Sequence, residues 1–230
     1  MGLIVEEKSI VIPGQSLAEG MDYLPGPFTY RQGEQIFSEV IGLVSVQGRA
    51  LRVTPFKGPY LPNEGDKIIG QVVNITFSGW QVNTNTAYIA MLNVKEATAR
   101  FVRKNEDLSQ IISIGEFIVA QIVAVTSQNL IDLSMKGPGL EKVEGGRIIR
   151  INPQKVPRVI GKLGSMITLI KQKTDCQITI GQNGLVWIRG RSPEQELLAE
   201  RAIQVIEDRA HEEGLTAVVE QFLGGPADGI

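Results

Sequence analysis

The chain has little of the side-chain chemistry that metal sites, disulfides and most active sites require. Among its 230 residues there is one cysteine and one histidine. A disulfide or a thiolate metal site needs more than one cysteine, so the single Cys176 excludes both within the chain, and its place in an expected strand favours a small buried apolar role. HExxH, Walker A and the clustered acidic motifs of two-metal nucleases are also missing. We therefore expect no cofactor and no metal.

The only histidine gives no support to a catalytic role. His211 falls in an acidic segment near the end of the chain, and the sequence gives no argument that pairs it with a serine or cysteine nucleophile. The expectation is a protein that is not an enzyme. The chain also lacks a signal peptide and any apolar run near 18 residues, which indicates a soluble, cytoplasmic protein.

Net charge is small, but its distribution is uneven. The total of −2 would by itself argue against a polyanionic partner. Residues 141–191, however, contain ten Lys or Arg against three Asp or Glu, whereas residues 192–230 contain two against nine. A basic region beside an acidic one can neutralise a few phosphates without binding every polyanion. The alternative is that most of these acidic residues lie on the solvent-exposed face of a helix.

Glycine, in contrast, is abundant, and two GxxG patterns occur among its 25 residues. About two or three such patterns are expected by chance, so the surrounding sequence must decide whether either pattern is functional. Only Gly161-Lys162-Leu163-Gly164 lies between apolar helical segments and carries a cation. Without a Cβ at either glycine, a sugar-phosphate backbone can approach the main chain, and the next helix directs its N-terminus at the phosphates. The alternative is a helix hairpin with no ligand.

The segments around this turn complete a recognisable order. We expect strands at 146–151, 176–180 and 185–189, a short helix at 153–160, a helix after Gly164 and a last helix after Ser192. The order strand, helix, GxxG, helix, strand, strand, helix matches an α+β type I KH domain, a fold that clamps about four nucleotides of single-stranded RNA. The predicted RNA contacts of this domain are Gly161, Lys162, Leu163, Gly164, Ser165, Arg150, Lys155 and Arg158.

The middle of the chain is rich in strand-forming residues. Five strands are expected, at 67–75, 80–83, 87–91, 117–125 and 130–135. A polar connection, 93–113, separates the third from the fourth, where an OB fold carries its inserted helix. These features predict a five-stranded OB-fold barrel.

Gly65-Asp66, Gly70 with Val72, and Gly79-Trp80 with Val82 resemble the OB fold of the ribosomal protein S-one type. In that family, aromatic residues on the second and third strands stack with bases, which is worth about 1 to 3 kcal/mol per base. The RNA contacts predicted for the barrel are Phe77, Trp80, Tyr88 and Lys136. The alternative for at least one of these aromatics is a structural role.

The first 64 residues hold six of the eleven prolines. We expect an irregular, all-β domain with strands at 36–46 and 49–54, too short to bury a large core alone and suited to docking on a partner. The whole chain then divides into four parts: an N-terminal domain (1–64), the OB barrel (65–136), the KH domain (141–213) and a frayed C-terminal tail (214–230).

This order of modules resembles the RNA-binding cap proteins of the archaeal exosome, the family of ribosomal RNA-processing protein four. Its most specific local mark is Gly181-Gln182-Asn183-Gly184, a GxNG turn typical of that family. The resemblance implies a structural role for Gly181, Asn183 and Gly184, whose residue types permit the positive φ angles of a tight strand connection.

The resemblance also implies a function. Three copies of the cap would sit on a hexameric ring of ribonuclease-PH-like subunits, which degrade RNA from 3′ to 5′ with phosphate. The cap would capture single-stranded RNA and feed it to the ring without catalysing the reaction. Two alternatives remain at this point: a transcription or translation factor with OB and KH modules, and an adaptor that binds only protein.

Overall fold

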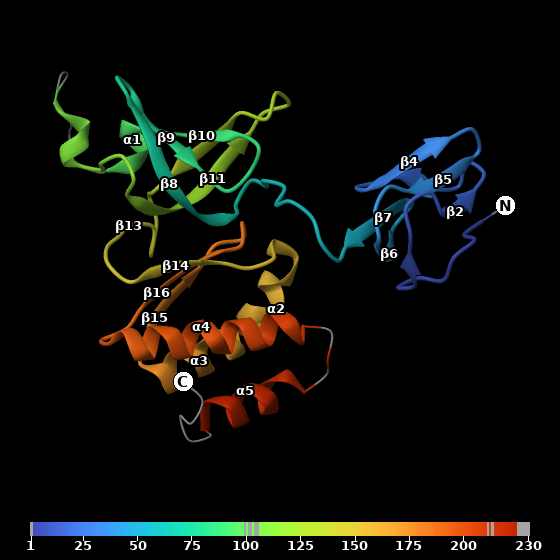
Figure 1. Ribbon diagram of the computed structural model, residues 1–230. Helices are drawn as coiled ribbons and strands as arrows, with labels where there is room; N and C mark the ends of the chain where they lie inside the picture. The colour runs from blue at the N-terminus through green and yellow to red at the C-terminus, as the bar shows by residue number, and fades with distance from the viewer. Residues whose placement is uncertain are drawn as a thin grey trace. The chain divides into compact units, whose positions relative to one another are not determined.

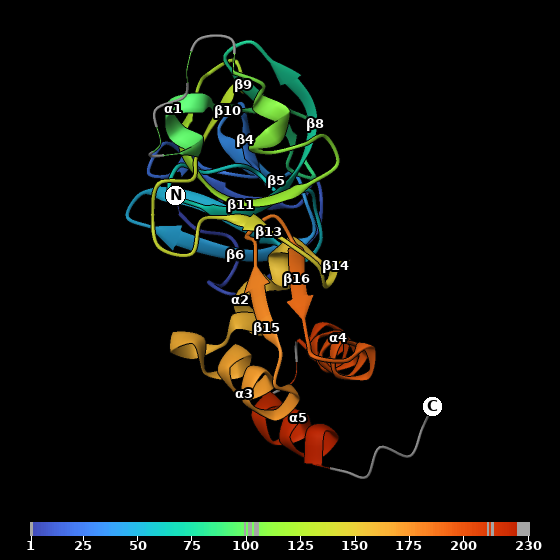
Figure 2. The same cartoon turned by 90° about the vertical axis from the view of Figure 1, so that its left-hand side faces the viewer.

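The computed structural model describes residues 2–98, 100, 103, 106–210, 212 and 214–224. The chain divides into two compact units, Met1–Gly58 and Pro59–Ile230. The first is an all-β domain, and the second contains a barrel and an α+β domain (Figures 1 and 2).

Two small sheets form the N-terminal unit. One has the strand order β1 (Ile10–Val11), β6 (Gly42–Gln47), β7 (Ala50–Pro55), β3 (Leu24–Pro25), and the other has the order β2 (Ser16–Glu19), β5 (Gln35–Ser38), β4 (Thr29–Gln32). Fully buried side chains from both sheets, among them Leu17, Ile36, Val44 and Leu51, form their common core. The unit therefore has a hydrophobic core of its own.

The single strand predicted over 36–46 is wrong. The chain leaves one sheet after β5 and enters the other at β6. Between them the Ser38 hydroxyl donates a hydrogen bond of 2.7 Å to the Val40 carbonyl, which turns the backbone. Gly42 then passes so close to β7 that a Cβ there would lie 2.2 Å from the Thr54 carbonyl oxygen. A segment predicted as one strand can thus supply two strands when a local side-chain bond bends it.

Five strands of the second unit close into a barrel. They are β8 (Lys67–Thr76), β9 (Gly79–Asn83), β10 (Ile89–Asn93), β11 (Phe117–Val125) and β12 (Ile131–Ser134). β8, β9 and β10 pair antiparallel in sequence, β10 pairs parallel with β12, and β11 closes the ring between β12 and β8. The predicted OB barrel is confirmed. Its inserted connection carries α1 (Val94–Ala97) and the 3-10 turn η1 (Leu108–Gln110).

Residues 56–66, the linker between β7 and the barrel, are fixed to the barrel itself at their end. Tyr60 is buried in the barrel core, and its hydroxyl donates a 2.6 Å hydrogen bond to Asp66 Oδ2. Burial, followed by the bond to Asp66, raises the pKa of Tyr60 far above its usual value, so the hydroxyl stays protonated. This bond holds the linker beside the first strand.

The α+β domain has the element order that the sequence predicts. Its elements are β14 (Arg147–Arg150), η2 (Pro153–Lys155), α2 (Val156–Ile160), η3 (Lys162–Gly164), α3 (Ser165–Thr174), β15 (Gln177–Ile180), β16 (Leu185–Arg189) and α4 (Pro193–Asp208). The antiparallel sheet has the order β14-β16-β15. The predicted type I KH fold is confirmed.

Side chains on the two faces of β16 pack against the helices of this domain and against the barrel. Val186 and Ile188 are buried in the core that the sheet shares with the helices. Leu185 and Trp187 point to the other face, where they pack with Ile69 of β8 and Val119 of β11. Since neighbouring strand residues face opposite sides, one strand serves both cores.

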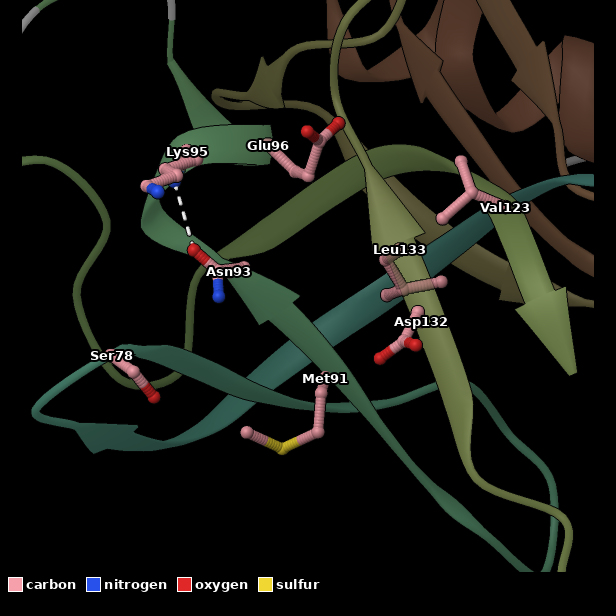
Figure 3. A pocket seen from close by; sticks show the side chains of 8 residues that line it. All are labelled: Ser78, Met91, Asn93, Lys95, Glu96, Val123, Asp132 and Leu133. Atoms are coloured by element: carbon pink, nitrogen blue, oxygen red, sulfur yellow. Dashed lines mark hydrogen bonds between the residues drawn. The ribbon is translucent and has the colours of Figure 1, made fainter. Parts of the chain in front are cut away.

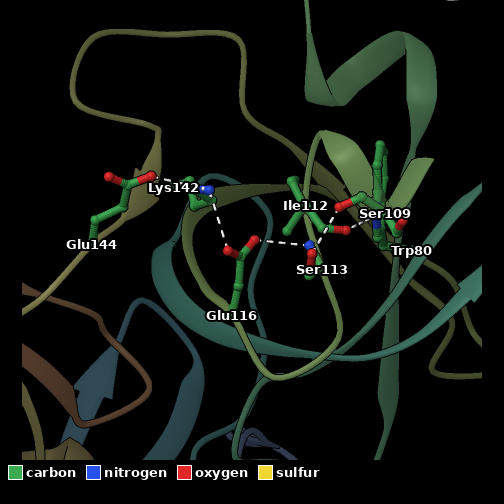
Figure 4. Close-up of polar contacts among 7 residues, drawn as sticks. All are labelled: Trp80, Ser109, Ile112, Ser113, Glu116, Lys142 and Glu144. Carbon is green, nitrogen blue, oxygen red and sulfur yellow. Dashed lines mark hydrogen bonds and ion pairs between the residues drawn. The ribbon is translucent and has the colours of Figure 1, made fainter. Parts of the chain in front are cut away.

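Strand β13 (Lys142–Val143) pairs with β11 of the barrel. Lys142 Nζ lies 3.2 Å from a carboxylate oxygen of Glu116 and 3.0 Å from one of Glu144, and Glu116 also accepts a bond from the Ser113 backbone (Figure 4). The first residues of the segment predicted as KH therefore lie on the barrel sheet.

The expectation of a frayed tail from residue 214 is wrong for most of that segment. Residues Leu215–Gly224 form helix α5, which packs on α3 and α4 (Figures 1 and 2). Leu215 and Val219 are buried in the KH core, and Leu223 packs against it. Apolar residues four apart lie on one helix face, which explains the packing. Residues 225–230 of the predicted tail lie outside the described part of the chain.

Candidate nucleic-acid interface

The two glycines of the GKLG turn are required for different reasons. Gly161 has φ 77° and ψ 172°, and a Cβ there would lie 2.7 Å from the backbone nitrogen of Met166. Gly164 has φ 79°, but its Cβ direction is open. Position 161 thus excludes a side chain by both conformation and space, whereas position 164 excludes it by conformation alone.

Leu163 is the most unusual residue of the turn. It has φ 53° and ψ 28°, the left-handed region that costs a residue with a Cβ about 1 to 2 kcal/mol. Its relative exposure is 101%, so no packing of its side chain offsets that cost. A strained, fully exposed apolar residue next to the exposed Lys162 is the kind of outlier that points to a binding role.

Helix α3 begins directly after this turn with an open N-terminus. Its N-cap is Gly164, and no side chain caps the helix. The Ser165 N–H donates to the Lys162 carbonyl, and the positive end of the helix dipole remains available to an anion. Ser165, the first residue of α3, is also exposed.

The remaining basic candidates of the KH domain differ in their exposure and in their hydrogen bonds. Arg150 and Arg158 are exposed. Lys155, in contrast, donates a 2.6 Å hydrogen bond from its ammonium to the Glu207 carbonyl near the C-terminal end of α4. This is the end of a helix at which a cation is stabilised. The structure therefore argues against Lys155 as a phosphate ligand.

Trp80 is not a base-stacking residue, and the prediction for it is wrong. Its side chain is fully buried in the barrel core, and its Nε1 donates a 2.8 Å hydrogen bond to the Ile112 carbonyl (Figure 4). Trp80 and Val82 are two apart on β9, so both face inward. This alternation is visible in the sequence and is the signal that identifies Trp80 as a core residue.

The other two aromatic candidates of the barrel are accessible. Phe77, in the turn between β8 and β9, has a relative exposure of 101%. Tyr88, just before β10, is exposed as well. Their positions leave both rings available for stacking.

Lys136 is already engaged. Its Nζ lies 3.0 Å from a carboxylate oxygen of Glu96, whose second oxygen accepts a 2.7 Å bond from the Ser134 hydroxyl. The Ser134 bond, followed by the Lys136 bond, lowers the pKa of Glu96. The ion pair offsets the positive charge of Lys136, which argues against its predicted role as a phosphate ligand.

A groove of about 590 Å³ lies on the barrel beside these residues (Figure 3). Its lining residues are Ser78, Met91, Asn93, Lys95, Glu96, Val123, Asp132 and Leu133. None of the predicted barrel contacts lines it, although Ser78 directly follows Phe77. The lining comes from strands and turns that only the closed barrel brings together, so spacing in the sequence gives no signal for it.

The GxNG turn binds the two domains of the second unit together. Asn183 is fully buried, and its Nδ2 donates to the carbonyls of Ile69 (2.7 Å) and Thr84 (2.8 Å), while its Oδ1 accepts a 3.3 Å bond from the Ile69 backbone. Only Gly184 of the motif has a positive φ, 79°. Gly181 is needed for close approach, since a Cβ there would lie 2.7 Å from the Ile69 nitrogen. The positive-φ explanation is therefore wrong for Gly181 and Asn183.

Other chemistry is sparse in the described part of the chain. There, no three His, Cys, Asp or Glu side chains gather as a metal site would require. Cys176 is buried as predicted, and burial raises the pKa of its thiol. His211 lies outside the described residues. Among the helices of the described segments, none has the length and apolar character needed to cross a membrane.

A β-rich N-terminal domain, an OB barrel and a type I KH domain with an open GxxG turn define a modular protein of the OB and KH class. The family described as "Exosome RNA binding protein RRP4 N-terminal domain" matches residues 8–57, and the KH domain family matches residues 146–208. The chain is 42% identical over 224 residues to exosome complex component Rrp4 of Thermococcus kodakarensis, a match that covers 96% of this chain and 87% of that protein. With the Rrp4 component of Methanothermus fervidus it shares 39% identity over 96% of this chain and 97% of the relative.

A crystal structure described as that of an exosome complex RNA-binding protein aligns with a TM-score of 0.66 and 32% identity. The alignment covers 73% of this chain and 96% of that one. The chain therefore belongs to the Rrp4 family of exosome components, and the predicted resemblance is confirmed.

Proposed function

We propose that this chain is a non-catalytic, cytoplasmic RNA-binding cap subunit of an exosome. It captures single-stranded RNA and delivers it to a ring of ribonuclease-PH-like subunits that degrade RNA from 3′ to 5′ with phosphate. Three copies would occupy one face of that ring. Family membership supports the assembly, and the open GKLG turn supports the RNA contact.

The observation that carries the RNA contact is the conformation of Leu163 beside an uncapped helix. Within four residues the turn exposes a cation and a strained apolar side chain, and the helix that follows has no side-chain cap. A phosphate can bind the lysine ammonium and the positive end of the helix dipole, and an exposed apolar side chain can contact a base or ribose. The turn thus combines the groups that bind a single strand.

An electrophoretic mobility shift with a short A-rich RNA tests this contact. The wild-type chain should shift the RNA, and the shift should fade as salt rises because phosphate contacts release counterions. The variant Lys162→Asp/Leu163→Asp should lose most of the affinity at moderate salt. An unchanged affinity would overturn the clamp.

The matched control is Lys57→Asp/Leu61→Asp. It makes the same two residue exchanges and the same change in charge at two exposed positions outside the KH domain. RNA binding by this control should stay close to that of the wild type. Equal losses in the two variants would mean that net charge, not the turn, governs binding.

For docking on the ring, we assign the apolar surface formed by β1, β6 and the residues beside them. Ile10 and Leu43 are Cα partners across these strands, and both are exposed, as are Ile12 and Ile41 nearby. β1 also lies at the edge of its sheet. Exposed apolar clusters of this kind are typical of protein interfaces.

Affinity co-purification from native extract tests the ring assignment. The wild-type chain should bring ribonuclease-PH-like subunits, and the variant Ile10→Asp/Ile12→Asp should not, while its RNA affinity in isolation stays unchanged. Co-purification of RNA polymerase in their place would favour the transcription-factor alternative. Retention of the ring by the variant would remove this surface from the interface.

A further inference from the structure

The turn between β9 and β10 of the barrel is bonded to the GxNG turn of the KH domain. The buried side chain of Asn183 donates a 2.8 Å hydrogen bond to the Thr84 carbonyl. In the opposite direction, Asn85 Nδ2 donates a 3.4 Å bond to the Asn183 carbonyl. Thr84 is itself fully buried. The barrel turn is therefore fixed on the KH domain at the point where β15 meets β16.

A series of hydroxyl bonds continues from Thr84 to Tyr88. The Thr86 hydroxyl donates a 2.9 Å bond to the Tyr88 carbonyl and accepts a 3.2 Å bond from the Tyr88 backbone N–H. It also lies 3.1 Å from the Thr84 hydroxyl. A threonine hydroxyl has one proton and two lone pairs. Because the proton of Thr86 goes to Tyr88, the Thr84 hydroxyl is the donor of the third bond.

Tyr88 stands at the end of this ordered turn with its side chain exposed. Asn85 has φ 59°, a left-handed conformation that asparagine tolerates better than most residues, and its N–H donates a 2.9 Å bond to Asn83 Oδ1. Tyr88 itself has a relative exposure of 41%. An aromatic residue whose backbone is already ordered loses little conformational entropy when it binds. The Tyr88 ring is thus preorganised for a contact.

The course of the KH chain brings the GxNG turn toward the GKLG turn. GKLG directly precedes α3, whose ten residues span about 15 Å. Two residues after α3 the chain enters β15, which packs on α3 and runs about 13 Å over four residues to the GxNG turn (Figure 2). A KH domain holds about four nucleotides. A strand that passes from GKLG along β15 would next reach the barrel turn.

We infer that the GxNG turn, acting through Thr84 and Thr86, positions the Tyr88 ring to stack on the base of the nucleotide next to those held by the KH domain. This inference rests on the proposed RNA-binding function. The ligand is a base of single-stranded RNA, bound by its π face with little base preference. Thr86 is a positioning residue, since it acts through Tyr88.

The test of the stacking compares two A-rich RNAs, one of about four nucleotides and one of about ten, by fluorescence anisotropy with the full chain. Tyr88→Ala should bind the short RNA like the wild type and the long RNA about fivefold to about a hundredfold more weakly, the loss of one stacked base. Tyr88→Phe keeps the ring and should retain the affinity. The matched control Tyr30→Ala removes a tyrosine of similar exposure, 39%, from the N-terminal unit and should change neither affinity.

The test of the positioning uses the Thr86 hydroxyl. Thr86→Val removes it at nearly constant shape and should weaken binding of the long RNA several-fold, whereas Thr86→Ser keeps it and should bind like the wild type. In the Tyr88→Ala background Thr86→Val should have no further effect, because the hydroxyl acts through the ring. A fluorescent adenine analogue, moved along the long RNA, should be quenched most at the nucleotide next to the KH site, and Tyr88→Ala should abolish this quenching.

Affinity of Tyr88→Ala for the long RNA equal to that of the wild type overturns the inference. Equal losses on both RNAs also overturn it, because the ring would then belong to the KH clamp. An equal effect of Thr86→Val with and without the Tyr88 ring overturns the positioning. If the wild type binds neither RNA, the proposed function itself fails, a result that differs from all of these.

Discussion

At the scale of single residues, the two glycines of the GKLG turn should respond differently to the same substitution. Gly161→Ala places a methyl 2.7 Å from the Met166 nitrogen in a backbone region that only glycine tolerates, so we expect a loss of about 2 to 3 kcal/mol. Gly164→Ala meets open space and should cost only the left-handed conformation, about 1 kcal/mol. Chemical denaturation measures both, and RNA affinity should fall further for Gly161→Ala. Equal effects would contradict the steric explanation.

Asn183 should be a stability residue. Asn183→Ala leaves the backbone of Ile69 and the carbonyl of Thr84 without a partner in a buried site, which should lower the free energy of unfolding by about 2 to 4 kcal/mol. Gln182→Ala, in the same turn, removes only a half-buried side chain and should cost under about 1 kcal/mol. Thermal unfolding followed by circular dichroism compares the two. Similar melting temperatures would show that the amide contributes little to the junction.

How far the sequence predicts this site differs from residue to residue. The openness of Lys162 and Leu163 follows from a glycine-flanked turn between two helices, which is a local property. The partners of Lys155 and Lys136 come from α4 and α1, far along the chain, and no spacing rule reports them. The burial of Trp80, in contrast, is readable from its alternation with Val82.

At the scale of elements, the junction of α1 and β12 should respond to acid. The Ser134 bond and the Lys136 bond lower the pKa of Glu96 from its usual 4.5. A carboxylate with a lowered folded-state pKa stabilises the fold above its unfolded pKa, and this stability is lost as pH falls through the folded pKa. Melts between about pH 6 and about pH 3 should therefore show a smaller decline for Glu96→Gln than for the wild type. Parallel curves for the two proteins would contradict this.

Most strands and helices of the second unit are predictable because hydrophobic periodicity and capping residues are local signals. The α4 N-terminus is an example: the Ser192 hydroxyl accepts a bond from Gln195, as the Ser-Pro-Glu-Gln pattern predicts. Two errors have different physical causes. The break between β5 and β6 accompanies a local hydrogen bond from the Ser38 hydroxyl to the Val40 carbonyl, whereas the packing of α5 depends on tertiary contacts with the KH core.

At the scale of the whole molecule, the hydrogen-bonded junction would join the two proposed RNA contacts, one on the barrel and one on the KH domain. A second contact on the same strand acts at a high effective concentration, so a modest KH clamp and an open barrel can together bind tightly. The net charge of −2 does not prevent this, because residues 141–191 contain ten Lys or Arg against three Asp or Glu. The distribution of charge along the chain is therefore a better indicator of RNA binding than the net charge.

The most direct test of the central claim is the salt dependence of RNA affinity for the wild type and for Lys162→Asp/Leu163→Asp. For single strands, the logarithm of the affinity falls with the logarithm of salt by about 0.7 for each phosphate contact. If the GKLG turn holds the strand, the variant should bind at least about tenfold more weakly at moderate salt and give a shallower slope. Identical affinities and slopes for the two proteins would contradict an RNA clamp at this turn.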